Sequence, residues 1–226
     1  MATTTDTIPE PQGLPELFVD FANTLSFDRG EPAEHLPDID ALLAWLREAG
    51  LISDRARAAE AHRLAQDPEE AERRLQRFRY LRALLQTMAA RISDGGAPTR
   101  RQLRELNHVL RHGLHFHQLQ IDDDATRYSV AQVGDRLDQA RAVIAGSFAS
   151  FLADDDPERL RTCANDGCRW VFVDRSRTGR RRWCDMRTCG NQAKVARHRA
   201  RRRAEGASGT IDPDASAAEE APVAIH

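Results

Sequence analysis

Apolar residues recur at helical spacing along most of the first 150 positions. Leu17, Phe18, Phe21 and Leu25 predict a helix over about 16–26. The same steps of three and four, bounded by capping residues, prolines and glycines, predict helices over about 38–49, 53–65, 68–92, 100–110 and 134–152. The long stretch 68–92 is either core or a dimer seam.

One segment breaks this helical pattern. Residues 115–121 and 127–133 alternate apolar and polar positions, and the polar loop Asp122–Ala125 lies between them. The alternation predicts a β-hairpin among the helices. The fold class we expect is therefore α+β, with a mainly helical N-terminal domain.

Composition changes along the chain suggest four parts. We expect 1–15 to be a flexible arm, 16–156 the helical domain, 157–204 a small second domain, and 205–226 a disordered acidic tail. The net charge of −2 conceals the same division. Residues 1–156 carry 18 basic and 26 acidic side chains, 157–203 carry 15 and 4, and 204–226 carry none and 5. The basic part is the one suited to an acidic partner.

Two cellular locations are disfavoured by the sequence. The longest apolar runs fall far short of the roughly 18 residues that cross a bilayer. The first residues lack the basic and apolar regions of a signal peptide. We expect a cytoplasmic protein without a membrane partner.

All four cysteines lie inside the basic part. Cys163 and Cys168 form one pair, Cys184 and Cys189 a second, with four residues inside each pair and fifteen between them. Two such pairs can supply a tetrahedron of thiolates to one zinc ion, in a closed shell that makes the metal structural. A redox role, an iron–sulfur role or disulfide bonds are the alternatives, and a reducing cytosol disfavours disulfides.

The rest of the basic part predicts a zinc finger of ribbon or treble-clef type. Residues 169–174 read as a strand and 176–179 as a turn. Residues 180–183, which lead to Cys184, read as a second strand. After Cys189, a helix to about 204 presents an alanine stripe suited to packing on the metal knuckles. The candidate nucleic-acid contacts in the turn and on the helix are Arg177, Arg180, Arg181, Arg182, Lys194, Arg197, His198 and Arg201.

Several short motifs resemble those of the CGNR zinc finger, a bacterial C-terminal module. The cysteine spacing, the run Phe172–Ser176, Arg182-Trp183-Cys184, and Lys194 with its following basic residues carry the resemblance. The eponymous motif reads Cys189-Gly190-Asn191-Gln192 here, so a glutamine replaces the arginine of the family name. The substitution leaves the zinc ligands intact.

The N-terminal part is similar to the ABATE domain that usually precedes this finger. The run Asp20–Thr24 and the order of helices and hairpin carry this likeness. The resemblance implies a transcription regulator of the stress-induced type, with DNA as the partner of the finger.

Other candidates are weaker. His108, His112, His115 and His117 crowd into ten residues and are either a second ligand site or surface histidines. Asp20 and Asn23 either line a ligand pocket or make local backbone hydrogen bonds. No triad, phosphate loop or metal-hydrolase motif is present, so we expect no enzyme.

These observations favour a zinc-dependent DNA-binding transcription regulator whose N-terminal domain senses a ligand or dimerises. The alternatives are an RNA-binding protein and a protein-interaction adaptor. Because 1–156 holds no cysteine and most large apolar residues, we expect it to fold without zinc, whereas 157–203 should fold only with metal.

Overall fold

The computed structural model of the chain describes residues 16–113, 116–121 and 128–207. They fall into two compact units, 1–184 and 185–226, each of which is described here by itself. The expected arm at 1–15 and the tail beyond 207 lie outside the described residues.

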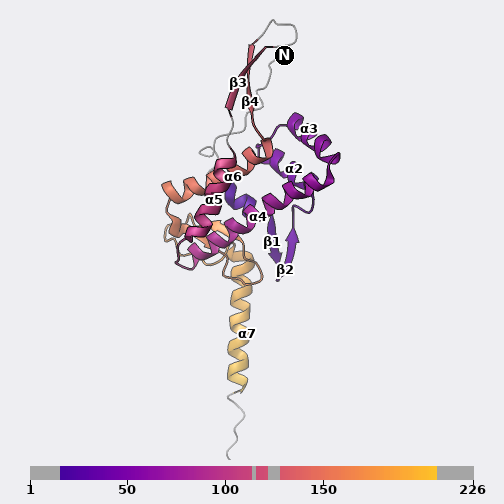
Figure 1. Ribbon diagram of the computed structural model, residues 1–226. Helices are drawn as coiled ribbons and strands as arrows, with labels where there is room; N and C mark the ends of the chain where they lie inside the picture. The colour runs from indigo at the N-terminus through magenta and orange to yellow at the C-terminus, as the bar shows by residue number, and fades with distance from the viewer. Residues whose placement is uncertain (1–15, 114–115, 122–127, 208–226) are drawn as a thin grey trace, which may run out of the picture. The chain divides into compact units, whose positions relative to one another are not determined.

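Helices dominate the first unit, and three short antiparallel hairpins accompany them (Figure 1). Its helices are α1 (Leu17–Ala22), α2 (Ile39–Glu48), α3 (Asp54–Ala65), α4 (Pro68–Ser93), α5 (Arg100–His112) and α6 (Arg136–Asp154). Its strands are β1 (Leu25–Asp28), β2 (Glu31–Glu34), β3 (Phe116–Ile121), β4 (Tyr128–Val133), β5 (Leu160–Thr162) and β6 (Val171–Val173). A 3₁₀ turn, Pro157–Arg159, precedes β5. The second unit contains a π-type turn, Met186–Gly190, and α7 (Asn191–Ala207).

The longest helix of the first unit is α4, and it begins where the sequence predicts. The Asp67 carboxylate accepts a hydrogen bond from the Glu70 N–H at 2.9 Å, and Pro68 occupies the first turn. The buried side chains of α4 are Ala71, Leu75, Phe78, Leu81, Arg82, Leu84, Leu85, Met88, Ala89 and Ile92. They cover more than one narrow face, so α4 is a core helix. No helix among the described residues combines the length and apolar character needed to cross a bilayer.

The core is closed by α1 and α6. Phe18 of α1 packs against Phe148 and Phe151, with ring centroids 5.0 and 5.2 Å apart. The Phe18 N–H donates to Ser147 Oγ at 3.0 Å, so a buried serine pairs with one of the N–H groups that the first turn of a short helix leaves without a backbone partner. The predicted hairpin is confirmed as β3–β4, in which Phe116 pairs with Val133 and Ile121 with Tyr128.

The first helix is shorter than predicted, because a hairpin takes its last residues. Leu25, assigned to the helix, opens β1, which pairs with β2. Arg29 and Gly30 form the turn with φ of 52° and 94°, both in the left-handed region that a two-residue hairpin loop favours. Glu and Pro are poor strand formers, and they hid β2 from the alternation test.

The strands β5 and β6 belong to the core of the first unit. Leu160, Val171 and Val173 are almost fully buried and join the same apolar cluster as α1 and α4. Both strands contact α4, and β6 also contacts α1. The expectation that 1–156 folds without the residues that follow stays a prediction, and this packing bears on it, since removing the strand pair would expose the apolar faces that it covers.

A buried amide joins α1 to β6. The Asn23 side chain donates to the Val171 carbonyl at 2.9 Å and accepts from the Val171 N–H at 2.9 Å. It thus makes the two backbone hydrogen bonds that a neighbouring strand would otherwise make. Nearby, the Thr162 N–H donates to Ser93 Oγ at 3.0 Å. Unpaired backbone groups are costly when buried, which makes these bonds specific links across the sequence.

We predict that Asn23→Ala destabilises the protein by about 2–4 kcal/mol, because it leaves the buried N–H and C=O of Val171 without partners. Urea unfolding of the zinc-loaded protein measures the change. Asn107→Ala, on the exposed surface of α5, is the matched control. Equal stability of the two variants would contradict the role assigned to Asn23.

Candidate metal centre and nucleic-acid interface

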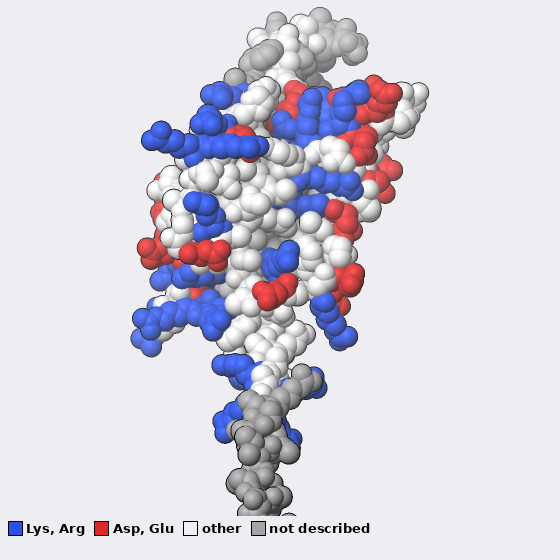
Figure 2. All heavy atoms as spheres, turned by 60° about the horizontal axis from the view of Figure 1, so that its bottom comes forward, with Lys and Arg blue, Asp and Glu red and all other residues white. Residues whose placement is uncertain are grey.

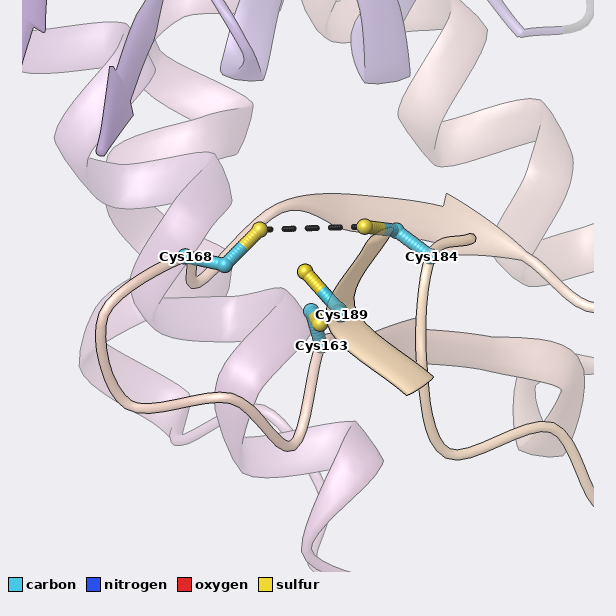
Figure 3. Close-up of side chains that lie close together, drawn as sticks. All are labelled: Cys163, Cys168, Cys184 and Cys189. Atoms are coloured by element: carbon cyan, nitrogen blue, oxygen red, sulfur yellow. Dashed lines mark hydrogen bonds between the residues drawn. The ribbon is translucent and has the colours of Figure 1, made fainter. Parts of the chain in front are cut away.

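The four cysteines come together. Their sulfur atoms all lie within 4.8 Å of one another, and the Cys168 and Cys184 sulfurs are 3.7 Å apart. Figure 3 shows the four side chains pointing toward a common point. Cys163 and Cys189 are buried, whereas Cys168 and Cys184 are partly exposed.

These distances fit a zinc ion. Four thiolates at the usual Zn–S distance of about 2.3 Å in a tetrahedron have sulfurs about 3.8 Å apart, which matches the 3.7 Å separation. A disulfide needs sulfurs about 2.05 Å apart, and none of the four cysteines, all of which the structure describes, is joined in a disulfide. The donor set is therefore that of one structural zinc site, in which Cys163, Cys168, Cys184 and Cys189 would be the ligands.

Burial raises the pKa of the Cys184 thiol, and the neighbouring Cys163 and Cys168 raise it further. Close sulfurs resist carrying like charges. A bound divalent cation supplies the opposing charge, which is why thiol clusters of this kind bind metal as thiolates and release protons when they do so.

The first knuckle is built on the strand pair β5–β6. Cys163 follows β5, and its N–H donates to the Trp170 carbonyl at 2.8 Å, which extends the ladder. The chain then turns tightly: the Cys168 N–H donates to the Asn165 carbonyl at 2.8 Å, and Arg169 has φ of 55°. Packing of β5–β6 in the core thus holds the knuckle.

Gly167 lies against the β1–β2 turn. Its carbonyl accepts a hydrogen bond from the Gly30 N–H at 3.0 Å. A Cβ at position 167 would lie 3.1 Å from the Gly30 nitrogen and 3.2 Å from the Arg29 carbonyl carbon, both rigid backbone atoms. Glycine lets the hairpin turn approach closely at this position, where any Cβ would be in tight contact with backbone, a reason invisible in the sequence.

The second knuckle lies in the turn Met186–Gly190. The Asp185 carboxylate accepts from the Arg187 N–H at 2.6 Å, and the Asp185 carbonyl accepts from the Gly190 N–H at 3.0 Å. These bonds close the turn that carries Cys189.

Asp174 organises the arginine-rich loop between the knuckles. Its side chain is completely buried and accepts from the N–H groups of Ser176 at 2.9 Å and Arg181 at 2.7 Å. Burial by itself would raise the pKa of Asp174, but hydrogen bonds from Ser176 and Arg181 lower it below its usual value. The carboxylate thus stays charged and holds the loop 175–181 in one shape.

The predicted partner strand at 180–183 is wrong. The partner of β6 is β5, which precedes the first cysteine. Residues 180–183 form no strand, although the Ala164 N–H donates to the Arg182 carbonyl at 2.8 Å. A strand of three residues next to an unassigned turn was too short to recognise by alternation.

A groove of about 660 Å³ runs beside the first knuckle. Its basic lining residues are Arg161, Arg169, Arg180, Arg181 and Arg182, and its acidic ones are Asp94 and Asp166. Sequence reasoning missed Arg161 and Arg169, because they adjoin the cysteines and not the predicted turn. On the face that Figure 2 shows, basic and acidic side chains are interleaved. Among the residues that line the groove, the five arginines outnumber the two acids, so positive charge is in excess there.

Two of the predicted contact residues also have structural roles. Arg181 donates to the Cys184 carbonyl at 2.5 Å and lies 5.1 Å from the Phe172 ring centroid. Arg182 lies 5.3 Å from the Trp183 ring centroid. Arg177 and Arg180 are exposed in the same loop. The Arg181 side chain holds the loop by a hydrogen bond, whereas the Arg182 guanidinium contacts the ring of its neighbour Trp183, so Arg180 and Arg182 are better probes of nucleic-acid binding than Arg181.

The helix α7 carries the other predicted contacts. Lys194, Arg197, His198 and Arg201 are all exposed. The predicted packing of the alanine stripe is wrong for the part of α7 whose side chains are described: Ala193 is half-buried, but Ala196 and Ala200 are exposed. Spacing alone identified an apolar stripe without showing whether anything covers it.

Asp20 and Asn23, the two residues of the predicted ligand pocket, lie in different surroundings. Asn23 is buried and its amide is used by Val171, while Asp20 is exposed. Although the residue as a whole is exposed, partial desolvation of its carboxyl group raises the pKa of Asp20, and nearby Glu16 raises it further. Of the histidine cluster, His108 and His112 stack with ring centroids 4.0 Å apart. His115 and the side chain of His117 lie outside the described part of the chain.

The fold and the cysteine site define a zinc-finger protein with a helical N-terminal domain. Family comparison agrees: residues 159–202 match the CGNR zinc finger, and residues 16–155 match the ABATE family, described as "Putative stress-induced transcription regulator". The second match covers more than half of the chain, so the protein belongs to the ABATE family. Comparison with curated proteins finds no match.

We predict that the purified protein contains one zinc per chain and that Cys184→Ser loses most of it, since a three-thiolate site cannot close the shell. Elemental analysis against protein concentration measures the ratio. Ser176→Ala, in the same loop but with no sulfur, is the control. Full zinc content in Cys184→Ser would overturn the assignment.

We also predict that Asp174→Asn costs about 1–3 kcal/mol, because one of the two N–H groups that the buried carboxylate accepts from then faces an amide donor. Urea unfolding in excess zinc measures this cost. Asp166→Asn removes an exposed carboxylate from the same finger and should have little effect. Comparable losses in both variants would mean that charge, and not the hydrogen bonds, matters.

Proposed function

We propose that the protein is a zinc-dependent DNA-binding transcription regulator. The observation that carries the proposal is the groove beside the cysteine site, where five arginines face two acids. Guanidinium groups bind phosphate oxygens with paired hydrogen bonds, and a row of them suits a nucleic-acid backbone.

The exposed basic face of α7 supports the same proposal. A helix that is polar nearly all round gains little from intrachain packing and is suited to a charged partner. Lys194 and Arg197 lie on one side of α7, at a spacing that could reach base edges in a major groove. The groove arginines would position the backbone, and the helix would select sequence.

The proposed metal role is structural. Four thiolates complete the coordination shell and leave no position for a substrate, which favours a binding protein over an enzyme. A cytoplasmic location is part of the proposal, since a reducing compartment keeps four clustered cysteines from forming disulfides and available to a metal. The N-terminal domain would provide the regulatory input, either by sensing a ligand or by dimerising.

We predict a salt-dependent affinity for duplex DNA. If about six phosphates are contacted, the slope of log K against log salt should be about −5. The double variant Arg180→Gln/Arg182→Gln should reduce the magnitude of the slope by about 0.9 per lost contact, and should lower the affinity for all DNA sequences alike. Fluorescence anisotropy with a short mixed-sequence duplex measures both quantities.

The control is Arg57→Gln, which removes an exposed arginine from α3, outside the groove. Lys194→Gln and Arg197→Gln should instead change sequence preference. Competition with a structured RNA of equal length separates DNA from RNA binding. A flat salt response with both nucleic acids would reject the proposal and favour an adaptor for an acidic protein.

A further inference from the structure

A second groove lies in the N-terminal domain, between α4 and α5, with α6 at its base. These three helices contact one another in the first unit (Figure 1). The groove has a volume of about 1060 Å³, close to the upper end of the size range of small-molecule sites. None of its lining residues belongs to the zinc finger.

The lining of this groove is strongly basic. Its arginines are Arg77, Arg79, Arg101, Arg104 and Arg141, and Glu105 is the single acidic lining residue. That carboxylate is already engaged: Arg101 donates to it at 2.8 Å. Hydrogen bonds from Arg101 and then Tyr80 hold the pKa of Glu105 below its usual value. Positive charge therefore exceeds negative charge among the lining residues.

Arg141 is the most informative member. It is only 7% exposed, and its Nε–H has no hydrogen-bond partner. Its Nη2 pairs with Asp138 at 2.9 Å, but Asp138 also receives Arg74 at 3.3 Å and lies 3.9 Å from Arg77. One carboxylate thus serves three guanidinium groups, and a buried charged donor is left over. A buried donor without a hydrogen bond costs free energy, and a ligand that accepts this hydrogen bond would remove the cost.

The remaining walls are flat and partly apolar. The Tyr80 side chain is 53% exposed, and Val109 and the stacked rings of His108 and His112 lie along α5. The His112 Nδ1 is 2.8 Å from the His108 carbonyl, which orients the ring and directs Nε2 away from the helix backbone. Rings and arginine planes together suit a planar ligand body.

We propose that this groove binds a small aromatic carboxylate, with its oxyanion at Arg141 and Arg104 and its ring against Tyr80. Bound ligand would be the signal input of the regulator, so this inference rests on the proposed function for its meaning. The binding itself does not depend on nucleic acid and is tested in its absence.

The test is isothermal titration calorimetry of the full-length, zinc-loaded protein with benzoate at constant pH and ionic strength. We expect benzoate to bind, and Arg104→Gln to weaken binding at least tenfold, since the lost hydrogen bond joins two charged groups. Arg111→Gln is the matched control: it removes an exposed arginine from α5 that does not line the groove. Tyr80→Phe keeps the ring and should retain binding.

Arg141→Gln should abolish benzoate binding, and far-UV circular dichroism shows whether this variant of a buried residue folds. If it does not fold, the result for Arg104→Gln alone tests the site. Absence of benzoate binding, or equal loss in Arg104→Gln and Arg111→Gln, overturns the proposal. Binding of inorganic phosphate but not benzoate also overturns it and assigns the groove to phosphorylated ligands. Unchanged DNA affinity of Arg104→Gln without ligand keeps the two proposals separate.

Discussion

The first unit is organised around one long helix, α4, that buries apolar side chains on several of its faces. Helix α4 packs against α1, α2, α3, α5 and α6, and it also receives β5 and β6 from the finger. No single neighbour could cover so much apolar surface. The strand pair that carries the first zinc knuckle is consequently part of the same core as the helical domain. The boundary between the two family matches, at about 155–159, is therefore not a boundary in packing.

This arrangement couples the metal centre to the N-terminal domain. Zinc would fix the knuckle after β5, while Asn23, Ser93 and the β1–β2 turn form hydrogen bonds with the same strands and knuckle. Helix α4 lines the arginine groove around Tyr80 and reaches β5 at its end. On the proposed function, a ligand in that groove and a partner of the finger would act on one shared helix.

Arginine has three different roles in this chain, and its surroundings distinguish them. Arg82 is buried and bonded through both Nη atoms to Glu34, so it is a satisfied core group. Arg181 holds the loop between the knuckles. The arginines of the two grooves outnumber the acids near them, and Arg141 keeps an unpartnered donor. Excess charge, rather than arginine content, is the sign of a binding surface.

Much of this protein could be predicted from local patterns. The capped helices, the β3–β4 hairpin and the four zinc ligands follow from hydrophobic spacing, capping residues and cysteine spacing, because each depends on neighbours within a few turns or on unmistakable ligand chemistry. Tertiary structure alone decided the remainder. It pairs β5 with β6, gives the Asn23 amide two hydrogen bonds to Val171, brings the β1–β2 turn close to Gly167, and forms the arginine groove. Each joins segments distant in sequence, and the contacts that define it exist only after the core has formed.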